Sequence, residues 1–162
     1  MILVLLLLIL LSLPFCAASA DNLLKNADFS DITSDQLPAD WETDAYVMDA
    51  GFTVFGVSGE DSDYPFAVSV QNIGENDARF AQTVTVEPES LYHFSGYIKA
   101  EQVNGGHGAN LSVEGVYAFS ESLYDTDGRW ERVDYYGETG PDQYEVTVFA
   151  RLGGYSGLST GK

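Results

Sequence analysis

The sequence predicts an all-β domain of short antiparallel strands that form a sandwich or a barrel. Apolar residues recur at every second position, which is the period of a half-buried strand and not of a helix. The alternating runs are short, and clusters rich in Gly, Asp and Asn separate them. Hydrophobic residues make up 45% of the chain and aromatic residues 13%, which is enough for a core. We therefore expect a two-sheet antiparallel β-sandwich with almost no helix.

The first segment, residues 1–20, is expected to be a signal peptide and not part of the fold. Its apolar run is too short to cross a bilayer and ends at Pro14. Ala18 and Ala20 supply the small residues of a cleavage site, so the mature domain should comprise residues 21–162. The only cysteine, Cys16, leaves with this segment, so the domain contains no disulfide. We expect a secreted or extracytoplasmic protein.

Eight segments are predicted as strands, three of them weakly. In chain order, the weak candidates are residues 22–29, 51–57 and 64–71. The clear candidates are residues 80–86, 92–100, 110–119, 130–136 and 145–152. The first clear run alternates up to Glu87-Pro88, where a proline ends it. Gly- and Asp-rich turns at residues 104–108, 125–128 and 137–141 bound the others.

The period of two assigns the side chains of these strands to opposite faces. The residues predicted to point inward are Tyr92, Phe94, Ile98, Val133, Tyr135, Val146, Val148 and Ala150. Those predicted to point outward are His93, Ser95, Tyr97, Lys99, Arg132, Asp134, Tyr136, Thr147, Phe149 and Arg151. The two tryptophans, Trp41 and Trp130, could stack on a sugar ring, but they are expected in the core or at the start of a strand.

The charge balance excludes two classes of partner. Asp and Glu number 25 against 7 Lys and Arg, which gives a net charge of −18. A nucleic-acid backbone and an anionic membrane surface both need a basic face, so neither is expected to bind. Disordered acidic tails are poor in aromatic residues, so the acidity belongs to a folded domain.

Six segments together resemble carbohydrate-binding modules of the family 4/9/22 type. The first is Asn22-Leu-Leu-Lys-Asn-Ala-Asp-Phe29 and the second is Leu37-Pro-Ala-Asp-Trp41. The others, in the order of the family, are Ala81–Pro88, Leu91–Ala100, Trp130–Val133 and Val146–Gly154. The resemblance implies a jelly roll similar to galactose-binding domains. It also implies binding of a polysaccharide or oligosaccharide without cleavage, by an accessory module with a catalytic or membrane domain downstream.

The sequence departs from this family in two places. Ser30 stands where the family has Glu, and Ala27 stands where it usually has Gly. The family's last strand, with its aromatic-Asp-Asp pattern, has no counterpart, so the resemblance implies a domain that lacks this strand. The early Glu and the late Asp commonly hold a structural calcium ion. These departures leave calcium binding open, with Asp28 and Ser30 as the candidate ligands.

Three aromatic and three basic side chains form the predicted sugar-binding site. Tyr97, Tyr136 and Phe149 share outward parity, and aromatic rings stack on the apolar face of a sugar. Arg79, Lys99 and Arg151 are the available cations that could bond sugar hydroxyls. Two alternatives remain: loops or another domain cover the rings, or Arg79 forms a structural ion pair.

Two other functions compete with carbohydrate binding. A structural or adhesive sandwich would contact protein, or its own downstream domain, through the same face. A small glycosidase would need two carboxylates about 5–5.5 Å apart, and Glu114 and Asp134 both fall at outward positions. Neither His93 nor His107 has a second ligand at metal spacing, and no nucleophile motif is present, so we predict that the protein is not an enzyme. The glycosylation sequon at Asn110 lies inside a predicted strand and is interpreted as chance.

Overall fold

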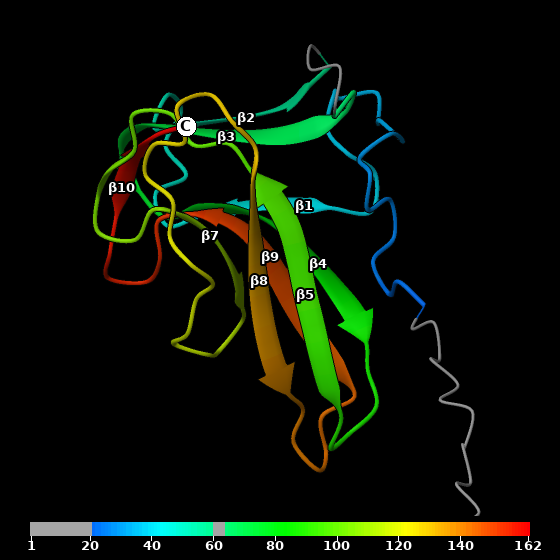
Figure 1. Ribbon diagram of the computed structural model, residues 1–162. Helices are drawn as coiled ribbons and strands as arrows, with labels where there is room; N and C mark the ends of the chain where they lie inside the picture. The colour runs from blue at the N-terminus through cyan, green and yellow to red at the C-terminus, as the bar shows by residue number, and fades with distance from the viewer. Residues whose placement is uncertain (1–20, 60–63) are drawn as a thin grey trace, which may run out of the picture.

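The computed structural model describes residues 21–59 and 64–162, which form ten strands and no helix (Figure 1). The predicted signal peptide lies outside the described residues. The strands are β1 (Glu42–Ala45), β2 (Thr53–Ser58), β3 (Ala67–Asn76), β4 (Ala78–Thr85), β5 (Leu91–Ile98), β6 (Asn104–Gly105), β7 (Ala109–Val113), β8 (Glu131–Glu138), β9 (Glu145–Leu152) and β10 (Ser159–Gly161). Within the described ranges, the search for a helix of membrane-spanning length and hydropathy finds none.

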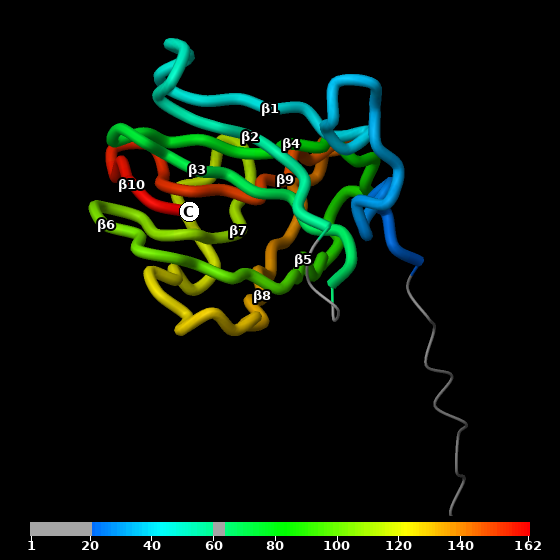
Figure 2. The backbone as a smooth tube through the Cα atoms, turned by 90° about the horizontal axis from the view of Figure 1, so that it is seen from above, coloured from blue at the N-terminus to red at the C-terminus, as the bar shows by residue number. Residues whose placement is uncertain are grey.

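The strands pack as an antiparallel β-sandwich, which confirms the predicted fold class. One layer is a four-stranded sheet in the order β1-β4-β9-β7. The other layer contains the β5–β8 pair and a sheet in the order β2-β3-β10-β6. β5 and β8 lie in front of β4 and β9 in Figure 1, and Figure 2 places them on the side of the molecule opposite β1. Every strand pairing is antiparallel.

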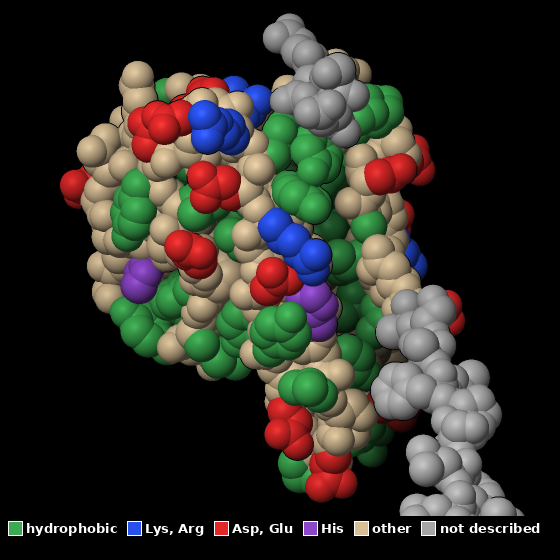
Figure 3. Space-filling view, viewed as in Figure 1, with side chains coloured by type: hydrophobic (Ala, Val, Ile, Leu, Met, Phe, Trp, Pro, Cys, Tyr) green, Lys and Arg blue, Asp and Glu red, His purple; other side chains and the backbone are tan. Residues whose placement is uncertain are grey.

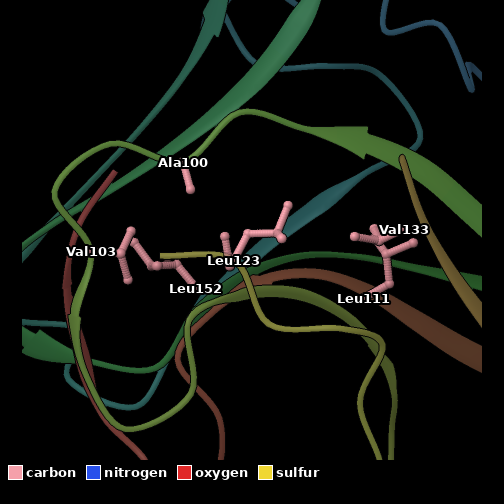
Figure 4. Close-up of a cluster of buried hydrophobic side chains, with 7 residues drawn as sticks. Ala100, Val103, Leu111, Leu123, Val133 and Leu152 are labelled. Atoms are coloured by element: carbon pink, nitrogen blue, oxygen red, sulfur yellow. The ribbon is translucent and has the colours of Figure 1, made fainter. Parts of the chain in front are cut away.

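Two hydrophobic clusters fill the space between the layers. The first is centred on Trp41, Phe80 and Val148, and the ring of Phe55 meets that of Phe80 edge-on at 5.4 Å. The second joins the layers through Leu111 and Leu152 on one side and Val133 on the other. Figure 4 shows Leu111 of β7 and Val133 of β8 meeting across this gap. The inward positions predicted for β5, β8 and β9 therefore do face the core.

Four of the five clear strand predictions are confirmed in place, and two predictions need correction. Residues 22–29 are not a strand: Asn26 and Phe29 have φ values of 44° and 56°, and the Asn26 side chain bonds the backbone of Asp31 as a turn does. The run 110–119 is two segments, because the chain turns at Gly115 (φ 75°) and Phe119 returns to bridge Ser112. β1 was not predicted, since its residues show no apolar alternation.

Candidate functional site

The outer face of β5 and β8 carries a row of large side chains. β5 alternates between exposed and half-buried residues along its whole length, as predicted. Its register with β8 sets His93 opposite Tyr136, Ser95 opposite Asp134 and Tyr97 opposite Arg132. Since directly opposed residues share a face, these six side chains lie together on the solvent side. Tyr97 is 50% exposed and Tyr136 is 63% exposed.

Aromatic rings from three segments gather at one end of this row. The ring of Tyr64, which precedes β3, lies 5.2 Å from that of Tyr97 and 4.9 Å from that of Trp130, centroid to centroid. Trp130 immediately precedes β8, and the Nζ atom of Lys99 lies 5.0 Å from the centre of its ring. This distance is within the range of a cation–π contact. The three rings and the ammonium group form one continuous patch.

An ion-paired group occupies the other end of the row. The imidazole of His93 stacks on Tyr136 with the ring centroids 4.4 Å apart and the planes 7° from parallel. Asp134 accepts a hydrogen bond of 2.6 Å from Nε2 of His93 and one of 3.0 Å from Nη2 of Arg132. The bond from His93 and the weaker effect of Arg132 hold the pKa of Asp134 below its usual value. We call the whole row the aromatic face: His93, Tyr136, Asp134, Arg132, Tyr97, Tyr64, Trp130 and Lys99.

The structure brings only half of the predicted sugar-binding residues together. Tyr97, Tyr136 and Lys99 lie on the aromatic face. Phe149 and Arg151 lie on β9, in the other layer, so their outward parity does not bring them beside Tyr97 and Tyr136. Both side chains point outward from β9, as predicted, but they are buried, and only 5% of Phe149 and 4% of Arg151 is exposed.

A returning loop and a bound carboxylate explain this burial. The guanidinium carbon of Arg151 lies 5.8 Å from the ring centre of Phe119 and 4.4 Å from that of Tyr155. Nε of Arg151 donates a hydrogen bond of 2.6 Å to Asp77, and Nη2 donates a second to the same carboxylate. Arg151 therefore forms a buried structural ion pair with Asp77, on a different sheet from the aromatic face.

Arg79 is also held by ion pairs and does not lie in an open groove. It lies on β4, where Nη1 donates to Asp77 at 3.1 Å and Nη2 donates to Asp44. Its guanidinium carbon is 5.0 Å from the ring centre of Phe149. The alternative interpretation, a structural ion pair, is the correct one for this residue.

The two candidate calcium ligands, Asp28 and Ser30, are hydrogen-bonded to each other. The hydroxyl and the amide of Ser30 donate hydrogen bonds of 2.9 Å and 3.2 Å to Oδ1 of Asp28. These bonds lower the pKa of Asp28. Across residues 21–59 and 64–162, no group of three or more His, Asp or Glu side chains has the arrangement of a metal site.

Sequence analysis left five members of the aromatic face out of the predicted site. Tyr64 belongs to a loop next to β3, and no pattern in the sequence relates it to β5. Trp130 was expected in the core or at a strand start; it immediately precedes β8, is half-buried and lies against Tyr64. The cross-strand partners His93, Arg132 and Asp134 were given the correct parity, and only the register of β5 with β8 shows that they belong to the site.

Comparisons with known proteins do not indicate a ligand for this site. No protein-family model matches the sequence, and no characterised protein matches it either.

Proposed function

We propose that the protein binds a carbohydrate, without cleaving it, through the aromatic face. The observation that carries this proposal is the row of exposed rings flanked by hydrogen-bonding charges on one layer of the sandwich. Tyr97, Tyr136 and Trp130 offer flat apolar surfaces that suit the C–H face of a sugar ring. Lys99 and Arg132 supply donors for hydroxyl groups beside them. A rigid sheet keeps this row in place before the ligand arrives.

The carboxylate in the row supports binding over hydrolysis. A glycosidase needs one carboxyl group with a raised pKa as its general acid. The pKa of Asp134 is instead lowered by His93, and its oxygen atom is already engaged by His93 and Arg132. Glu114, the second carboxylate considered, follows β7 in the other layer.

The proposal also covers the export of the domain and its role within a larger protein. The resemblance to carbohydrate-binding modules suggests a jelly-roll module that is exported and works as an accessory to a catalytic or membrane domain. The strongly acidic composition suits a neutral or basic glycan better than an acidic one, because like charges repel.

The first prediction tests this face with Tyr97→Ala. Stacking residues at the centre of an interface often contribute about 1–3 kcal/mol of binding energy. We therefore expect a loss of about 5- to 150-fold in affinity for a glycan identified on an array, with little change in Tm because the ring is half-exposed. Affinity electrophoresis and calorimetry on the full chain measure the two quantities.

Tyr46→Ala is the matched control for this experiment. Tyr46 is 73% exposed and directly follows β1 in the other layer, so its removal should leave affinity unchanged. Equal losses in both variants would contradict the assignment of the face. If no glycan binds and a protein partner is instead lost on Tyr97→Ala, the adhesive alternative is correct.

A further inference from the structure

A long apolar trough separates β3 from β5. Its volume is about 1160 Å³. Residues of β3 and of the segment before it, including Val68 and Val70, line one wall, and Phe94 and Ile98 of β5 line the other. The core residues Leu111 and Leu152 form the floor. Figure 3 shows hydrophobic side chains in the hollowed part of the face that carries β5 and β8.

Both walls of the trough carry strand edges without a hydrogen-bonded neighbour. Among the described residues, β5 pairs with β8 over Leu91–Ile98 and with no other strand. β3 pairs with β2 over Ala67–Asn72, and on its other side it meets β10 only at Asn72 and Asn76. The edges of Ala67–Gln71 and of β5 thus face the same trough with their backbone groups available.

β10 leads directly into this trough. It runs antiparallel to β3, with Gly161 opposite Asn72. The next residue, Lys162, exchanges two backbone hydrogen bonds with Glu101: its amide donates at 3.0 Å and its carbonyl accepts at 2.6 Å. A reciprocal pair of this kind is the repeat of an antiparallel ladder. Lys162 itself lines the trough.

We propose that the trough accepts one additional β-strand that runs on from β10, antiparallel to both β3 and β5. Such a strand would join the β2–β3 pair and the β5–β8 pair into a single sheet of five strands, in the order β2, β3, new strand, β5, β8. It would give both strand edges a hydrogen-bonded neighbour, and its apolar side chains would cover the half-buried side chains that line the trough.

The two neighbouring edges give the same register for this strand. Extension of the Gly161–Asn72 pairing puts the first and third residues beyond Lys162 opposite Val70 and Val68. Extension of the Lys162–Glu101 pairing puts the same two residues opposite Ala100 and Ile98. All four of these partners pack in the core. The first, third and fifth residues of the strand should therefore be apolar and inward, while the second and fourth point outward beside Tyr97.

The backbone of β5 is already oriented for this pairing. The amide and carbonyl of Ala100 bond Thr126, on the side away from the trough. Because backbone groups alternate in direction along a strand, the amides of Tyr97 and Ser95 point into the trough, as that of Glu101 does.

The test extends the full chain after Lys162 with eight residues of alternating Val and Thr, since β5 has eight residues. One extension starts with Val, and the matched control starts with Thr and has the same composition. A shift of one residue turns every side chain to the other face. We expect the Val-first chain to melt about 5–10 °C above the control. We also expect amide exchange at Ser95 and Tyr97 to slow by at least about tenfold, as it does for newly paired strands.

Two outcomes would overturn the proposal. The first is equal melting temperatures together with unchanged exchange at both amides. The second uses the Val-first peptide added in trans to the unextended chain, where we expect weaker stabilisation because the attached strand has a high effective concentration. If the free peptide stabilises as strongly as the fused one, attachment to β10 gives no advantage, and the proposal that the strand runs on from β10 is wrong. Neither measurement involves a sugar, so its result is independent of the proposed function.

Discussion

Asp77 holds two arginine side chains at the junction of β3 and β4. Its carboxylate accepts hydrogen bonds from Arg151 on β9 and from Arg79 on β4, and its side chain is almost fully buried. Sequence reasoning listed both arginines as donors to sugar hydroxyls, with a structural ion pair as the other interpretation of Arg79. The sequence gives no information about which carboxylate they contact.

The second prediction concerns this carboxylate. Asp77→Asn keeps the side-chain volume and removes the charge, which leaves the guanidinium of Arg151 buried beside a neutral amide. Loss of one member of a buried ion pair costs about 3–5 kcal/mol, so the free energy of unfolding in urea should fall by that amount. Asp44→Asn is the control, because this half-exposed residue contacts Arg79 alone and its loss should cost no more than about 1 kcal/mol. Similar losses for the two variants would refute the central role of Asp77.

The strands β5 and β9 illustrate what a period of two can and cannot predict. Alternation gave the correct inward and outward residues in both strands, because successive side chains of any strand point to opposite faces. On β5 the outward face meets solvent, whereas on β9 the ring of Phe119 covers Arg151. Coverage depends on where a distant loop folds, so only three of the six residues predicted for the site lie on the aromatic face.

The third prediction compares two neighbours on β5. Phe94 packs between the two hydrophobic clusters and Ser95 is exposed on the aromatic face. Phe94→Ala should lower the free energy of unfolding by about 2–4 kcal/mol, somewhat less than for a fully buried phenylalanine. Ser95→Ala should change it by less than about 0.5 kcal/mol. Denaturation curves of both variants check the register, and a reversed order would mean that the faces of β5 are exchanged.

At the scale of the whole molecule, composition and periodicity were sufficient for the fold class. They gave an all-β sandwich because short alternating runs can bury a face only against another sheet. They did not give the grouping of strands into layers, which depends on pairings between residues distant in sequence, such as Ala78 with Leu152. The aromatic face is a product of this grouping.

The net charge of −18 leads to the fourth prediction. Acidic side chains exceed basic ones by 25 to 7, so the compact state is opposed by repulsion among like charges. Screening lengths fall from about 30 Å at 0.01 M salt to about 10 Å at 0.1 M. We expect Tm to rise as sodium chloride increases over this range. A Tm that stays constant or falls would show that local ion pairs, such as those of Asp77, outweigh the general repulsion.

The buried side chain of Asn110 has a consequence for the timing of modification. It is 0% exposed, and its amide nitrogen donates hydrogen bonds to the carbonyls of Gly108 and Gly153. Its sequon, which ends at Ser112, is therefore inaccessible to a glycosyltransferase once β7 has paired with β9. A glycan on Asn110 could be attached only to a chain that had not yet folded, and it would then block the closure of that layer. In a host that glycosylates exported proteins, the fraction of chains with a glycan on Asn110 would show how often the transferase acted before the chain folded.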